Sequence, residues 1–373
     1  MLSLNLRRVV FIFLLVLAAS TLSRAQTPSP TATPKISEDD TVVKVSSRLV
    51  VVPVSVTDAS GQPVPGLKID DFRIAEEGRQ QKLDSVGTAD KVPLEIVLLF
   101  DVSASTDAMF KFEQDTAAAF LKDVMRPEDR ATIFSIGQKS QLVQGRDTAD
   151  QSVASISTIA ATKGATAFFD TMRDAAEYLR KNSPTGRRRV VVVISDGEDN
   201  FSEAVQRAYR EKESKIAAGD DPDFKKTGSI VAQAQQTVKM RERARVLRAL
   251  QNADTVFYSI NPAGSSYYLN TISVFGQENM QQFADQTGGS AFLPKFQPID
   301  TKDTLTNVSN TRKNKATLEL IFRQLANELR AQYLVQYYSE SEFPLNKYVK
   351  LDVGLNNRGP LRLRARQGYF VKE

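Results

Sequence analysis

The 373-residue chain contains no cysteine, no histidine and no tryptophan. Without cysteine it forms no disulfides, thiolate zinc sites or iron–sulfur clusters. Without histidine it has no imidazole metal ligand and no Ser-His-Asp or Cys-His catalytic machinery. Any metal that this chain binds is therefore expected to be a hard cation held by oxygen atoms.

The overall composition is that of a packed protein. Hydrophobic residues make up 41% of the chain and charged residues 25%, which excludes wholesale disorder. The length suggests two domains, or one large domain with a smaller companion. Because there are no disulfides, the core alone must stabilise the fold.

The N-terminus has the pattern of a secretory signal peptide, predicted at residues 1–25. Arg7 and Arg8 precede an apolar run, and small residues lead to Ala25. The run is shorter than the roughly 20 residues of a membrane-spanning helix, although an uncleaved anchor is the alternative. We expect no membrane span in the mature chain and a secreted or periplasmic location. Removal of this segment lowers the formal net charge from +5 to +2, so the charge does not support a nucleic-acid partner.

Both ends of the remaining chain predict β structure. Residues 26–40 are rich in Pro, Thr and Ser and predict a flexible linker. Residues 41–91 and 332–373 both carry short alternating patterns of β-branched residues separated by turn residues. Because the N-terminal strands alone are too few for a core, we expect the two ends to form one small β-sandwich domain.

Residues 92–331 predict an α/β domain with a doubly wound, mostly parallel sheet. Short runs rich in Val and Ile alternate with helical patterns, as expected of parallel strands covered by helices on both faces. The predicted strands are Leu94–Phe100, Ala131–Ile136, Val190–Ser195, Thr255–Ile260 and Ser290–Pro294. The predicted helices are Met109–Met125, Phe168–Arg180, stretches within Ser202–Asn252, Asn279–Thr287 and Ala316–Ala331.

Three polar stretches in this region are interpreted as solvent-facing. Residues 209–236 predict a charged helical insertion made of two surface helices. Residues 301–315 predict an exposed polar loop. Arg187–Arg189 is interpreted as the charged entrance of a strand rather than as a binding patch.

Five oxygen-bearing side chains follow predicted strands. Asp101, Ser103 and Ser105 form an Asp-x-Ser-x-Ser motif, Thr166 starts a helical pattern, and Asp196 follows the most apolar strand. The carboxyl ends of parallel strands form one ligand crevice. Three hydroxyls and two carboxylates suit Mg²⁺, with Mn²⁺ or Ca²⁺ as alternatives. Ser and Asp also cap helices and form turns, so none of these motifs alone is specific for a metal site. The prediction rests on the presence of all three: the Asp-x-Ser-x-Ser motif, Thr166 and Asp196.

This set resembles the metal-ion-dependent adhesion site (MIDAS) of the von Willebrand factor type A family, whose pattern is Asp-x-Ser-x-Ser, then Thr, then Asp. The resemblance implies that Ser103, Ser105 and Thr166 touch the ion directly. It also implies that Asp101 and Asp196 act mainly through water and hydrogen bonds to the hydroxyls.

The resemblance covers about residues 92–331, and the flanks are similar to those of secreted bacterial "VWFA-related domain" proteins. It implies a binding module whose ion coordinates an Asp or Glu of a partner protein. An envelope scaffold with an unused metal site is the alternative. A metal-dependent hydrolase is disfavoured because no Lys or Arg lies within the metal motifs, Lys163 being the nearest candidate. Asp107, Glu198 and Asp199 are interpreted as solvated loop acids, and the alternative is that they tune the charge of the site or support its ligands.

Overall fold

A computed structural model describes residues 47–103, 107–162, 164–217, 224–261, 271–298, 301–356 and 359–372. The predicted signal peptide, the predicted linker and the residues up to 46 lie outside this part of the chain.

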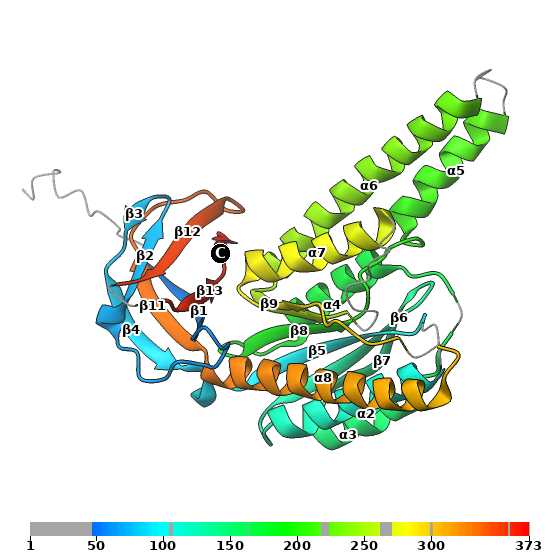
Figure 1. Ribbon diagram of the computed structural model, residues 1–373. Helices are drawn as coiled ribbons and strands as arrows, with labels where there is room; N and C mark the ends of the chain where they lie inside the picture. The colour runs from blue at the N-terminus through cyan, green and yellow to red at the C-terminus, as the bar shows by residue number, and fades with distance from the viewer. Residues whose placement is uncertain are drawn as a thin grey trace, which may run out of the picture. The chain divides into compact units, whose positions relative to one another are not determined.

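The centre of the described chain is a six-stranded sheet in the order β10-β9-β8-β5-β6-β7 (Figure 1). Neighbouring strands pair in parallel except β6 and β7, which are antiparallel. The predicted mostly parallel α/β sheet is therefore confirmed. Its strands are β5 (Leu94–Asp101), β6 (Arg130–Ile136), β7 (Ser140–Asp147), β8 (Arg188–Ile194), β9 (Thr255–Ile260) and β10 (Ala291–Phe292).

Helices cover both faces of this sheet because its strands are apolar on both sides. Along β5, Ile96 and Leu98 enter one core, whereas Val97 and Leu99 enter the other. The first core includes α2 (Asp107–Val124), α3 (Ala149–Thr158) and α8 (Thr304–Ala331). The second includes α4 (Phe168–Asn182), α6 (Phe224–Asn252) and α7 (Thr271–Thr287). None of the helices described here combines the length and apolar composition needed to cross a bilayer.

The predicted helical insertion corresponds to a helix pair. α5 (Glu203–Ala217) packs against α6, and the two helices connect β8 to β9. Figure 1 shows this pair extending beyond the sheet.

The prediction of a polar loop at residues 301–315 is wrong, because α8 begins at Thr304. Asp303 caps the helix by accepting hydrogen bonds from the backbone N–H groups of Leu305 and Thr306. The polar side chains of Asn310 and Asn314 are buried, since both donate hydrogen bonds to backbone carbonyls of the preceding segment at 297–298. The first half of α8 is polar in sequence because it packs against backbone carbonyl groups that accept hydrogen bonds, and not only against apolar side chains.

Two further elements were not predicted: the antiparallel edge strand β7 and the helix α3. β7 has no regular alternation of buried and exposed residues, and α3 buries only Ser152 and Ile156. Neither element therefore leaves a clear hydrophobic period in the sequence.

Strands from the two ends of the chain share two four-stranded sheets, in the orders β13-β1-β11-β4 and β14-β12-β2-β3. β1 pairs with β11 and β2 pairs with β12, both antiparallel. The N-terminal strands are β1 (Arg48–Thr57), β2 (Phe72–Glu76), β3 (Arg79–Gln80) and β4 (Leu83–Thr88). The C-terminal strands are β11 (Tyr333–Ser339), β12 (Tyr348–Leu355), β13 (Arg362–Ala365) and β14 (Gly368–Phe370). The two sheets contribute to one hydrophobic cluster, which includes Val52 and Val54 from one sheet and Ile74 and Val349 from the other.

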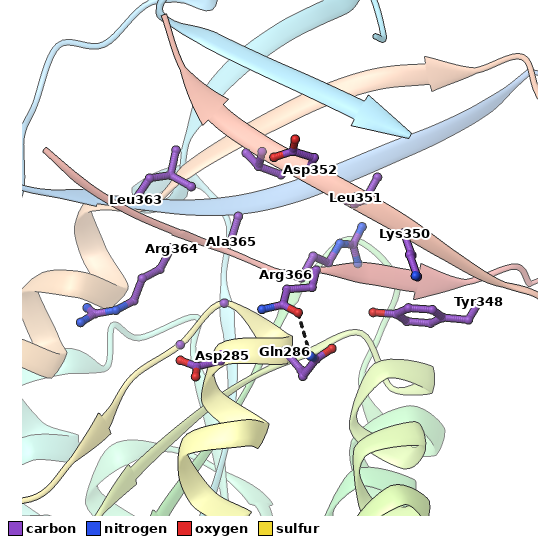
Figure 2. Close-up of a pocket in the computed structure, with 14 residues that line it drawn as sticks. Asp285, Gln286, Tyr348, Lys350, Leu351, Asp352, Leu363, Arg364, Ala365 and Arg366 are labelled. Atoms are coloured by element: carbon purple, nitrogen blue, oxygen red, sulfur yellow. Dashed lines mark hydrogen bonds between the residues drawn. The ribbon is translucent and has the colours of Figure 1, made fainter. Parts of the chain in front are cut away.

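Polar contacts join these end strands to the α/β part. Gln286, near the end of α7, donates a hydrogen bond to Gln367 at 2.7 Å (Figure 2). The neighbouring residues Thr287 and Arg366 form a backbone bridge. A cavity of about 700 Å³ lies beside this contact, and Figure 2 shows residues of both charge signs along it.

Candidate metal-binding site

The order of strands in the sheet reverses between β5 and β8. From β5 the chain goes to β6 and β7 on one side, and it later adds β8, β9 and β10 on the other. Loops that leave the sheet at such a reversal diverge and open a ligand crevice between them. Asp101 is the last residue of β5, and Asp196 lies two residues after β8. The fold therefore explains why these two carboxylates meet.

Asp101 is buried and its carboxylate is held by two serines. Ser103 donates both its backbone N–H and its hydroxyl to Oδ1, at 3.0 and 2.6 Å. The hydroxyl of Ser195 donates to Oδ2 at 2.6 Å. Asp101 thus orients the hydroxyl of Ser103, a contact of the kind that the family resemblance implies.

Thr166 is tied to the loop after β8. Its hydroxyl donates to the carbonyl oxygen of Glu198 at 2.9 Å, and its backbone N–H donates to the side chain of Asn200 at 2.7 Å. In return, the backbone N–H groups of Asn200 and Phe201 donate to the carbonyl of Thr166. The loop before α4 and the loop after β8 therefore form one hydrogen-bonded unit.

The backbone next to Asp196 lies very close to α7. Gly197 has a φ of +76°, and a Cβ atom at Gly197 would lie 2.6 Å from the carbonyl oxygen of Gly276. A Cβ atom at Gly276 would lie 2.7 Å from the carbonyl oxygen of Asp196. Both positions require glycine, because any side chain would push α7 away from the Asp196 loop.

The carboxylates of this site are poorly compensated. Burial raises the pKa of Asp101, and the charge of Glu198 adds to that rise, although hydrogen bonds from the serines oppose it. Burial also raises the pKa of Asp196 to about 6, with further contributions from the charges of Asp101 and Glu198. Desolvation and like charge both disfavour the ionised forms, and a nearby cation relieves both effects.

Glu113, on α2, is a carboxylate that the sequence reasoning did not single out. It is buried, and burial together with the charge of Asp101 raises its pKa to about 8. Its position among the polar residues Lys111, Gln114 and Asp115 of the same helix gives no local signal, because its proximity to Asp101 arises only from the packing of α2 on the sheet.

The donors present fit a divalent cation. The hydroxyls of Ser103 and Thr166 donate their protons to protein acceptors, so their lone pairs remain available to an ion. Within the described residues, no three acidic side chains are grouped as metal ligands, so a bound ion would need hydroxyl ligands as well. Ser105, the third predicted hydroxyl, lies outside the described residues.

The interpretation of the neighbouring acids needs one correction. Asp199 is not a solvated loop acid, because only 3% of it is exposed. Its carboxylate accepts hydrogen bonds from the backbone N–H of Phe169 in the first turn of α4 and from Ser202. Its role is to fix the loop after β8 against α4. The side chain of Asp107 and the residue Lys163 lie outside what the structure describes.

The surroundings of the site include the insertion and a cavity. Lys239 on α6 is half-buried, and its pKa is lowered by burial, against the opposing charges of Asp199 and Glu198. A cavity of about 630 Å³ is lined by residues of the β6–β7 connection, α4 and α5, and by Phe201, whose backbone N–H donates to the carbonyl of Thr166. Its lining includes Gln138, Lys139, Asp170, Phe201 and Arg210.

Residues 96–198 match the family model of the von Willebrand factor type A domain. The matched segment runs from β5 through Asp196 and contains every predicted metal ligand. The chain contains a von Willebrand factor type A (VWA) domain. VWA domains mediate protein–protein interactions and commonly bind a divalent metal at a MIDAS.

No curated protein matches the chain, but several solved structures are similar to it. A von Willebrand factor type A protein from Catenulispora acidiphila is 9% identical, with a TM-score of 0.42, and the match covers 87% of this chain and 74% of that one. The PilB minor pilin from Streptococcus sanguinis is 11% identical, with a TM-score of 0.40 and coverages of 65% and 63%.

Proximal thread matrix protein 1 from the mussel byssus is 10% identical, with a TM-score of 0.39. The match covers 69% of this chain and spans only 50% of the mussel protein. Another structure of the mussel protein, at 11% identity, a TM-score of 0.35 and coverages of 68% and 50%, is described as having a zinc-occupied MIDAS motif.

Proposed function

We propose that the protein is a secreted binding module that uses a divalent cation to hold an Asp or Glu side chain of a partner protein. The observation that carries this proposal is the orientation of Ser103 and Thr166, whose hydroxyls both donate to protein acceptors at the same sheet edge. These two hydroxyls and that of Ser105 would hold the ion, while Asp101 and Asp196 supply negative charge.

Mg²⁺ is the proposed ion, with Mn²⁺ or Ca²⁺ as alternatives, since all three accept oxygen ligands. When bound, it supplies a Lewis-acid position for a carboxylate oxygen from outside the chain. Because the hydroxyls are neutral ligands, the ion keeps enough positive charge to attract that carboxylate. We propose that the partner residues next to this carboxylate lie in the cavity beside Phe201 and Lys139.

We propose binding rather than catalysis. Hydrolysis requires a base or a nucleophile near the ion, and the chain has no His or Cys to supply one. Asp101 is held by Ser103 and Ser195, and Asp199 is held by backbone and Ser202, so these two carboxylates already have structural roles.

The proposed organisation of the chain has four parts. Residues 1–25 are cleaved on export to the periplasm or the exterior, and residues 26–40 form a linker. Residues 92–331 form the VWA domain, with the helical insertion near 209–236. Residues 41–91 and 332–373 form one β-sandwich domain, which is supported by the hydrophobic cluster that their two sheets share.

Calorimetry with Mg²⁺, Mn²⁺ and Ca²⁺ tests the metal site. The parent protein should bind at least one of these ions, whereas Asp196→Ala and Ser105→Ala should abolish binding. Asp174→Ala is the matched control, because Asp174 is an exposed carboxylate on α4, and it should bind as the parent does. Equal affinity in the parent and in Asp196→Ala would refute the site.

Capture experiments test the partner. Immobilised protein is incubated with the native envelope fraction, with and without EDTA, and in parallel with Asp196→Ala. A partner that needs the ion should be retained by the parent alone and released by EDTA. Retention that survives both EDTA and Asp196→Ala would place the binding surface elsewhere.

A further inference from the structure

A cavity of about 400 Å³ lies at the amino-terminal edge of the six-stranded sheet, opposite the VWA metal loops. Arg188 and Arg189 line it from the start of β8, and Arg366 lines it from the segment between β13 and β14. Residues of β1 and β11 form another part of the wall. The cavity is thus bounded by both the α/β part and the end strands.

The three arginines keep hydrogen-bonding capacity that the described residues do not use. The Nε atom of each is buried and has no hydrogen-bond partner among the residues that the structure describes. Their terminal nitrogens are mainly bonded to backbone carbonyls, that of Arg188 to Leu329 and that of Arg189 to Ala253. These contacts fix the guanidinium planes. Because each guanidinium carries five N–H donors, terminal N–H groups remain for a ligand, whereas the buried Nε–H groups are not accessible from the cavity.

The positive charge of the cavity is only partly compensated. Arg187 is paired with Glu95, and Arg366 is paired with Asp254. In the described part of the chain, no carboxylate lies within ion-pair distance of Arg188 or Arg189. Burial lowers the pKa of Arg188 to about 10, as expected for a cation that is desolvated without an adjacent anion.

Part of the remaining wall is apolar. It is formed by Val51, Pro53, Val92, Val190, Val256 and Leu334, whereas Thr185, Gln332, Gln336 and the carboxylate of Asp254 make other parts polar. A free inorganic ion would make no use of such a surface, whereas an anion with an apolar body would bury it against these side chains. The volume is at the lower end of the range for small-molecule sites.

We propose that this cavity binds a small organic anion, in which a carboxylate or phosphate group is attached to a short apolar body. Its oxygens accept hydrogen bonds from Arg188, Arg189 and Arg366, since guanidinium groups match oxyanions in both charge and geometry. The apolar body lies against the valines. Because the cavity is bounded by β8 and by β1 and β11, the ligand stabilises the contact between the α/β part and the end strands, and it raises the unfolding temperature.

The test uses the full chain in 150 mM NaCl, with benzoate, phenyl phosphate, inorganic phosphate and neutral benzamide as probes. Calorimetry and thermal unfolding should show binding of benzoate, of phenyl phosphate or of both. The comparison of these two probes shows whether the cavity prefers a carboxylate or a phosphate. Benzamide and inorganic phosphate should bind at least about tenfold more weakly, because each lacks either the charge or the apolar body.

Two variants probe the cavity itself. Arg189→Gln should weaken binding of the preferred anion at least about tenfold. Val51→Phe, which keeps all the arginines but fills the space, should abolish it. Arg364→Gln is the control, because Arg364 is a nearby arginine paired with Glu328 and does not line this cavity.

Several results would overturn the proposal. These are no binding of any anion at 20 mM, equal binding of benzamide, binding of inorganic phosphate as tight as that of phenyl phosphate, and equal losses in Arg364→Gln and Arg189→Gln. If Arg189→Gln does not fold, Val51→Phe and the benzamide comparison decide the question.

Discussion

Ser195 donates its hydroxyl proton to Asp101 at 2.6 Å, although the two residues are 94 positions apart in the chain. Both side chains are buried, and the Ser195 hydroxyl also accepts a hydrogen bond from the backbone N–H of Gly197 at 3.0 Å. Ser195 therefore connects the carboxylate at the end of β5 to the loop that carries Asp196. In a metal site, such a residue orients the ligands without touching the ion.

Ser195→Ala should therefore weaken Mg²⁺ or Mn²⁺ binding by about 10- to 100-fold, the usual effect of losing a residue that orients metal ligands. The change leaves one oxygen of a buried carboxylate without its donor. Ser259→Ala is the matched control on the adjacent strand, because the buried hydroxyl of Ser259 has no hydrogen-bond partner among the described residues. Calorimetry should show weaker metal binding for Ser195→Ala and parent-like metal binding for Ser259→Ala.

Gly276→Ala should disturb the site from α7. Its Cβ would lie 2.7 Å from the carbonyl oxygen of Asp196 and 2.8 Å from the carbonyl carbon of Gly197. Because these are backbone atoms, the loop or the helix must shift. We expect a lower unfolding temperature and weaker metal binding. Gly87→Ala, where a Cβ would meet nothing within 4 Å, should change neither. Parent-like metal affinity in Gly276→Ala would show that the loop tolerates the shift.

The central strands could be predicted from the sequence because burial on both faces requires continuous apolar runs, as in Leu94–Phe100 and Val190–Ser195. α8 could be predicted only in its second half. Its first half contains Asn310 and Asn314, which are buried because they bond to the backbone of residues 297–298. A hydropathy pattern does not detect polar side chains that are buried through hydrogen bonds, so the polar sequence predicts a loop.

The residues of the candidate site also differ in how far the sequence could predict them. Asp101 and Asp196 could be placed together because the parallel strands β5 and β8 end at one edge of the sheet. The expectation that Thr166 also follows a strand is wrong, because Thr166 lies between α3 and α4. Ser195 and Asn200 could not be assigned roles, since each acts through a contact with a loop that is 94 or 34 residues away in the chain. Their residue types are also common in ordinary loops, so nothing local distinguished them.

Glu76 should be a key residue for the stability of the end strands. Its buried carboxylate accepts hydrogen bonds from Tyr337 at 2.8 Å, from Ser339 at 2.7 Å and from Tyr369 at 2.6 Å. These donors lie on strands of both sheets. Glu76→Ala leaves three buried hydroxyls unpaired, and we expect a loss of about 3 kcal/mol or more in the free energy of unfolding. Denaturant unfolding checks this, with the exposed Glu342→Ala as control.

The same cluster should make the protein sensitive to alkali. Burial, together with the hydrogen bond to Glu76 and its charge, raises the pKa of Tyr369 to about 12 from its usual value of 10. The folded state keeps this tyrosine neutral, so its contribution to stability is complete below pH 10 and is lost as the pH rises toward 12. Tyr369→Phe should show a shallower decline of unfolding temperature over this range. Tyr338→Phe, at an exposed position, should follow the parent.

Asp196→Ala should cost the metal-free protein no stability. In the absence of an ion, Asp196 is partly buried beside the like charges of Asp101 and Glu198, and both conditions oppose its ionised form. Its carboxylate accepts a hydrogen bond from the backbone N–H of Glu198, which lies in the same loop. With EDTA at neutral pH, we expect the variant to unfold at the same temperature as the parent or higher. With excess Mg²⁺ the order should reverse, because only the parent gains stability from binding. A variant that is less stable in EDTA would mean that Asp196 supports the fold rather than the ion.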